Sequence, residues 1–75
     1  GEGRSGVIVC DSINGRVAIF EAKRTKEFDG LENQCNKALQ QIDERRYAED
    51  FEDAYDHILC YGISFYKKRC LVKKK

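Results

Sequence analysis

The sequence has no proline, no methionine, no tryptophan and a single histidine. It also has no low-complexity segment, so disorder is not expected away from the chain ends. No apolar run is long enough to cross a membrane and no signal peptide is present, so no membrane partner is expected. Because a chain without methionine cannot have kept its start residue, we expect these 75 residues to be a fragment of a longer protein.

The four cysteines form no C-x-x-C pair, and the lone His57 has no neighbouring ligand pattern, so a zinc site is not expected. Each cysteine lies at an apolar position of its segment. This predicts reduced thiols in the core of an intracellular, cytoplasmic protein. The alternative is a disulfide between Cys60 and Cys70, which are expected to share a hairpin.

The charges balance to a net +1 but are unevenly distributed. Residues 43–56 carry seven acidic and two basic side chains, whereas residues 67–75 carry six basic and no acidic ones. The simplest interpretation is two solvated surfaces of opposite sign. The basic segment is also suited to holding a polyanion.

Apolar, β-branched runs predict four strands, at residues 6–10, 16–23, 57–65 and 69–73. The Asn14-Gly15 pair predicts a tight turn between the first two strands. The third strand is apolar almost throughout, which is typical of a strand covered on both faces. The fourth is expected at a sheet edge, because its lysines discourage further pairing.

Between the second and third strands, apolar residues recur at helical spacing from Leu31 to Ile42. This predicts a helix to about Tyr47, capped by Asp29 with Glu32 as its capping-box partner, and a short helix over residues 48–55. The ββαββ order predicts one α/β domain over residues 1–75 with a mixed four-stranded sheet. The helical connection makes the second and third strands parallel.

Glu21 and Lys23 stand two residues apart on the second strand, so they share a face. A carboxylate that binds Mg²⁺ and an ammonium that stabilises a scissile phosphate suit metal-assisted phosphodiester hydrolysis. E-x-K alone is a weak motif, and an ion pair at the strand end is the alternative.

Four stretches carry a resemblance: GEGRS at 1–5, IFEAKR at 19–24, ALQQI at 38–42 with Tyr47-Ala48, and YGISF at 61–65. In order and spacing they resemble the motifs of a bacterial PD-(D/E)XK nuclease family. The resemblance implies a restriction-endonuclease-like core lacking its N-terminal helix. It also implies DNA as substrate, Mg²⁺ or Mn²⁺ as cofactor, and a preceding AAA-ATPase-like domain in the parent chain.

The resemblance assigns Glu21 as the acidic metal ligand, Lys23 as the catalytic lysine and Gln41 as a polar catalytic position. It gives Tyr47 a role that packing alone explains. Phosphate contacts are expected from basic residues around the active-site face: Arg4, Arg24, Lys26 and Lys37. Such contacts position nucleic acid without conferring sequence specificity.

The departure from the family pattern is at Gly6, where similar sequences carry the aspartate that is the main metal ligand. Gly6 lies opposite Glu21 if Ile13 and Asn14 are at the centre of the turn, and opposite Lys23 if Asn14-Gly15 is the turn. In either register it shares their face, whereas Asp11 faces the other way. Loss of one carboxylate predicts impaired or absent catalysis.

Three hypotheses follow. The chain is a metal-dependent nuclease module, active or disabled at Gly6. Alternatively, it is a non-catalytic interaction or nucleic-acid-binding module attached to an AAA-ATPase-like protein. The thin core and missing first helix also raise a homodimer formed by edge pairing or helix exchange.

Overall fold

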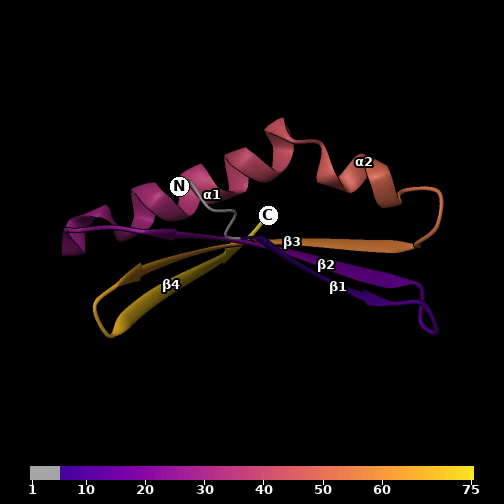
Figure 1. Cartoon of the computed structure of the whole chain (residues 1–75), viewed down its shortest axis with the longest axis horizontal. Helices are drawn as coiled ribbons and strands as arrows, with labels where there is room; N and C mark the ends of the chain where they lie inside the picture. The colour runs from indigo at the N-terminus through magenta and orange to yellow at the C-terminus, as the bar shows by residue number, and fades with distance from the viewer. Residues whose placement is uncertain (1–5) are drawn as a thin grey trace.

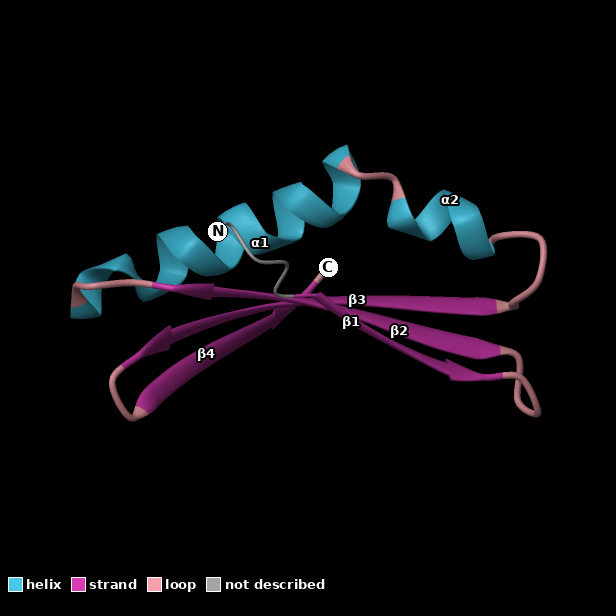
Figure 2. Cartoon of the chain, in the orientation of Figure 1, coloured by secondary structure: helices cyan, strands magenta, loops and turns pink. Residues whose placement is uncertain are grey.

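The computed structural model describes residues 6–75. The elements follow in the order β1 (Gly6–Asp11), β2 (Arg16–Arg24), the short 3₁₀ helix η1 (Phe28–Gly30), α1 (Leu31–Glu44), α2 (Tyr47–Phe51), β3 (His57–Tyr66) and β4 (Arg69–Lys74). Both α-helices lie on the same side of the sheet (Figures 1 and 2). The predicted phosphate contact by Arg4, and the rest of the GEGRS stretch at residues 1–5, lie outside the described part of the chain.

The four strands form one sheet in the order β1-β2-β3-β4, so each strand lies beside its neighbour in sequence. The β1–β2 and β3–β4 pairs are antiparallel, while β2 and β3 are parallel and connected through the helices. The predicted mixed α/β sheet is therefore confirmed, and it agrees with a restriction-endonuclease-like core.

The hydrophobic core lies between α1 and the centre of the sheet. Val17 and Ile19 of β2 are buried against Cys35, Ala38 and Ile42 of α1. These helix residues recur at the three- and four-residue spacing that places them on one face. The amphipathic pattern of the sequence thus determines which face of α1 packs on the strands.

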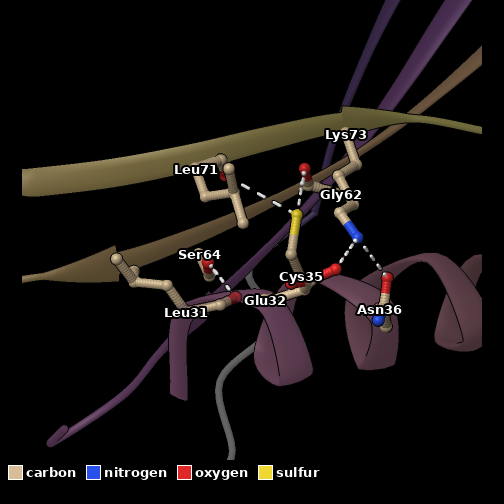
Figure 3. A network of polar contacts seen from close by, with 8 residues as sticks. All are labelled: Leu31, Glu32, Cys35, Asn36, Gly62, Ser64, Leu71 and Lys73. Carbon is tan, nitrogen blue, oxygen red and sulfur yellow. Dashed lines mark hydrogen bonds and ion pairs between the residues drawn. The ribbon is translucent and has the colours of Figure 1, made fainter. Parts of the chain in front are cut away.

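Polar contacts hold α1 on β3 and β4 (Figure 3). The Ser64 hydroxyl donates to the Leu31 carbonyl at 2.6 Å, and the Cys35 thiol donates to the Gly62 carbonyl at 3.0 Å. At the other side of the helix, Lys73 donates to the Glu32 carboxylate at 2.9 Å. The start of α1 is therefore fixed over the two C-terminal strands.

The predicted capping box is wrong. Asp29 lies inside η1, and the N-cap of α1 is Gly30, with no side-chain cap hydrogen bond. A Cβ at position 30 would clash with the Thr25 hydroxyl oxygen, which would have to move aside for a larger residue. This close approach places a glycine, rather than Asp29, at the start of α1.

The long helix also ends earlier than predicted. Its last residue is Glu44, and Arg46 then adopts a left-handed conformation with φ of 55° before α2 begins at Tyr47. A left-handed residue interrupts the helical hydrogen-bonding pattern. The short second helix consequently covers residues 47–51 instead of 48–55.

The expectation that β3 is covered on both faces is wrong for the described residues. Only Gly62 and Ser64 of this strand are fully buried, and both face α1. On the other side of the sheet Val7, Phe65 and Val72 keep 42–58% of their surface exposed. The apolar run of β3 therefore reflects one covered and one uncovered face.

The cysteine prediction holds for one residue. Cys35 is buried, whereas Cys10 and Cys70 are exposed and Cys60 is partly exposed, and all four are free thiols. Cys70 lies opposite Phe65 in the β3–β4 ladder, five residues beyond Cys60, so the two cannot form the suggested disulfide. Partial burial raises the pKa of the Cys60 thiol above its ordinary value.

No helix among residues 6–75 combines the length and the apolar character needed to cross a bilayer.

Candidate functional site

Glu21 is a buried carboxylate with an unpartnered oxygen. It lies on β2 facing α1 and keeps 2% of its surface exposed, and its Oε1 atom has no hydrogen-bond partner among residues 6–75. Burying an ionised carboxylate without a partner is costly. A side chain retained in this position despite that cost is a candidate for function.

Gly6 lies directly opposite Glu21 in the β1–β2 ladder. Of the two predicted registers, the one with Ile13 and Asn14 at the centre of the turn is therefore correct. A Cβ at position 6 would lie 3.1 Å from Glu21 Oε1. The β1 residue nearest to Glu21 Oε1 is therefore a glycine, which offers this oxygen no side chain.

Asp11 does not replace the missing carboxylate. It lies at the far end of β1, opposite Arg16, and five residues from Gly6, so it points to the other face of the sheet. Hydrogen bonds from the Asn14 side chain and from Arg16 hold the pKa of Asp11 below its ordinary value. Its carboxylate is engaged in the β1–β2 turn.

Lys23 follows Glu21 on the same face, opposite Ser64 of β3. No ion pair of 4 Å or less joins Lys23 to Glu21, and Glu21 is buried. The alternative interpretation of E-x-K as an exposed ion pair at a strand end is therefore wrong. The two residues share a face without neutralising each other.

Gln41 lies on the flank of α1 that faces away from β4. The opposite flank is identified by Glu32 and Asn36, which bind Lys73 of β4 (Figure 3). With 3.6 residues per turn, Gln41 and Arg45 lie on the other flank, one turn apart. No hydrogen bond joins Gln41 to Glu21, so a catalytic role for Gln41 stays a prediction.

Arg45 is a neighbour of the site that the sequence did not indicate. Its guanidinium donates to the Tyr47 hydroxyl at 3.1 Å. That hydrogen bond chiefly, and the charge of Glu21 to a smaller extent, raise the pKa of Arg45 above its ordinary value. Tyr47, its hydrogen-bond partner, lines a small pocket together with Gly6, which lies opposite Glu21. Arg45 could have been identified from the sequence, because it lies four residues, about one helical turn, after Gln41.

The described residues do not form a complete metal site. Across residues 6–75, no three histidine, cysteine, aspartate or glutamate side chains are close enough together to hold a metal ion. Glu21 supplies one oxygen ligand, and the position that faces it is glycine. Since Mg²⁺ prefers several oxygen ligands, the side chains of residues 6–75 alone do not fit the ion that the motif implies.

The predicted phosphate contacts separate into two groups. Arg24 and Lys26 are exposed and line one pocket of about 560 Å³ at the ends of β2 and β3. Lys37 is exposed on α1 and does not line that pocket. The pocket instead includes Lys67, which the sequence indicated only as part of a basic segment.

The chain matches a known protein family. The model of a family described as the PD-(D/E)XK nuclease superfamily matches residues 1–75, which is the whole sequence given. No curated protein and no solved structure matches.

Proposed function

Because the chain belongs to the PD-(D/E)XK nuclease superfamily, we propose that it is a DNA-binding, nuclease-like domain whose catalytic capacity is impaired at Gly6. One observation carries the proposal: Gly6 lies opposite Glu21, and its missing Cβ would lie 3.1 Å from the unpartnered Oε1. Position 6 is where a second carboxylate would face Glu21, and this chain has glycine there.

Nucleases of this superfamily generally use Mg²⁺, which polarises the phosphodiester and lowers the pKa of an attacking water. In this chain Glu21 would hold the ion, and one carboxylate from residues 6–75 is too few for tight binding. Lys23, on the same face, is placed to contact a phosphate. We derive no catalytic step, because residues 6–75 do not complete the metal site.

The proposal is tested with the Gly6→Asp variant. An aspartate at position 6 brings a second carboxylate beside Glu21, and the two like charges should destabilise the metal-free protein by about 1–3 kcal/mol. Mn²⁺ or Mg²⁺ should reverse this loss, because the cation binds both carboxylates. Thermal unfolding in EDTA and in millimolar Mn²⁺ measures both effects.

Gly6→Asn is the matched control, since it adds nearly the same volume without the charge. It should show no stabilisation by Mn²⁺. Cleavage of a labelled DNA substrate by Gly6→Asp with Mg²⁺, lost again in Gly6→Asp/Glu21→Gln, would support a disabled nuclease. A Gly6→Asp variant that neither responds to Mn²⁺ nor cuts DNA would refute the proposal.

The second candidate function is non-catalytic binding of nucleic acid or of a partner protein. It is favoured by the glycine opposite the Glu21 carboxylate. It predicts that Gly6→Asp leaves both metal response and cleavage unchanged and that Glu21→Ala leaves binding intact. Attachment to an AAA-ATPase-like domain stays a prediction from the family resemblance.

A further inference from the structure

A basic pocket lies at the ends of the two central strands, away from Glu21. It has a volume of about 560 Å³ and is lined by Arg24, Thr25 and Lys26 after β2, and by Phe65, Tyr66 and Lys67 at the end of β3. Ligand pockets commonly have volumes of roughly 300–1,000 Å³. The pocket therefore has room for a nucleotide.

The cations of this pocket are not neutralised by the fold. Within residues 6–75, no ion pair engages Arg24, Lys26 or Lys67. The adjoining loop carries two carboxylates, Glu27 and Asp29, and the β3–β4 turn adds Lys68 and Arg69. Five basic residues thus face two acidic ones, and the region favours an anion.

Aromatic rings border the same cations. Lys67 Nζ lies 5.3 Å from the centre of the Tyr66 ring, and the Arg69 guanidinium lies 5.1 Å from the centre of the Phe28 ring. Phe28 and Phe65 keep 52% and 42% of their surface exposed. Exposed rings beside cations are the combination that binds the bases and phosphates of single-stranded nucleic acid.

The walls of the pocket are fixed by backbone contacts. The Thr25 N–H donates to the Phe65 carbonyl at 2.9 Å, which continues the β2–β3 pairing past the end of β2. The Thr25 hydroxyl accepts from the Glu27 N–H at 3.2 Å and orders the following loop. The backbone segments that carry the cations therefore have a defined separation before any ligand binds.

Lys67 adopts a backbone conformation that glycine would adopt more easily. Its φ is 53°, in the left-handed region, at the first position of the two-residue turn between Tyr66 and Arg69. Strained residues occur preferentially at functional sites, where the side chain has a use. Here the residue with the left-handed backbone, Lys67, lines the pocket.

We propose that this pocket binds a segment of single-stranded DNA, with phosphates on Arg24, Lys26 and Lys67 and a base against the exposed Phe65 ring. The inference rests on the proposed function for DNA as the ligand. It adds the binding site and the form of the DNA. A duplex presents phosphates but keeps its bases stacked, so it cannot use the aromatic ring. Arg24 lies three residues after Glu21 on β2 and pairs with Phe65, so its side chain points to the face of the sheet opposite to Glu21.

The test is the binding of a fluorescein-labelled 20-mer of thymidylate, followed by anisotropy at low salt, with a 20-base-pair duplex as comparison. We expect the single strand to bind at least tenfold more tightly. Lys67→Gly should weaken binding of the single strand about three- to tenfold and reduce the slope of log K against log salt by about 0.7. Its fold should be retained, because glycine suits the left-handed turn.

Arg46→Gly is the matched control. It also removes one positive charge from a residue with a left-handed φ, 55°, but at the other end of α1 (Figure 1). This variant should bind the single strand as the unmodified chain does. Phe65→Ala should weaken binding of the single strand while leaving duplex binding unchanged.

The inference fails if Lys67→Gly and Arg46→Gly weaken binding equally, or if the duplex binds as tightly as the single strand. Either result leaves the proposed function standing, since DNA still binds. Absence of binding to both DNAs would overturn this inference and the DNA-binding part of the proposed function. The effect of Mn²⁺ on Gly6→Asp is measured without DNA, so it reports on the metal site separately.

Discussion

At the scale of single residues, the relation between Gly6 and Glu21 was largely predictable. Alternation along a strand places residues of equal parity on one face, and a hairpin turn admits only a few registers. The sequence left two registers open, and the four-residue turn after Asp11 selects the one that pairs Gly6 with Glu21. The burial of Glu21 was less predictable, because it depends on the depth at which α1 packs.

Replacing Glu21 should reveal what the buried carboxylate costs the fold. We expect Glu21→Met to raise the free energy of unfolding by about 1–3 kcal/mol at pH 7, because it removes a buried, unpartnered oxygen. Urea denaturation measures the change. Glu21→Gln, which keeps the shape and a polar end, should gain less. Destabilisation by Glu21→Met would mean that the carboxylate has a stabilising partner in the fold.

At the scale of elements, the strands were predicted nearly as they occur, because β-branched and apolar runs define them. The helix start was not, because the sequence offers Asp29 as a cap while the close approach of Gly30 to Thr25 begins α1 one residue later. Only part of the basic pocket was predicted from the sequence. Arg24 and Lys26 were identified, but their meeting with Lys67 depends on the parallel pairing of β2 and β3.

The helix and sheet meet most closely at Gly62. A Cβ there would lie 2.6 Å from the Cys35 carbonyl oxygen, which belongs to the helix backbone and cannot move aside alone. We expect Gly62→Ala to lower the free energy of unfolding by about 1–3 kcal/mol, as overpacking does. Chemical denaturation measures the loss.

Gly6→Ala provides the comparison for this prediction. Its new methyl group would meet the end of the Glu21 side chain, which can rotate, so the loss should be smaller than for Gly62→Ala. Equal losses in the two variants would show that the contact between α1 and β3 is no tighter than the contact at the hairpin.

At the scale of the whole molecule, the described residues form two layers, with helices on one side of the sheet only (Figure 2). The exposed Val7, Phe65 and Val72 on the other side could not be distinguished from core residues in the sequence. The same ambiguity explains why Cys70, opposite Phe65, was expected in the core. Cys10 lies opposite the buried Val17 and is exposed because β1 is at the edge of the sheet. A homodimer stays a prediction, which light scattering would test.

The order of the strands also has a consequence for how quickly the chain folds. Both hairpins are local, and one connection of 32 residues, from Arg24 to His57, separates the parallel pair. Closing it costs on the order of 3 kcal/mol of chain entropy. The contact of α1 with β3 offsets that cost, so we expect it to form in the folding transition state.

Cys35→Ala removes the thiol that bonds the Gly62 carbonyl across this contact. In stopped-flow experiments it should slow folding more than it speeds unfolding, with a φ-value above about 0.5. A value near zero would mean that the crossover closes before the helix docks. A φ-value above about 0.5 would mean that the parallel pairing of β2 with β3, which also brings together the two sides of the basic pocket, sets the speed at which the protein reaches its native state.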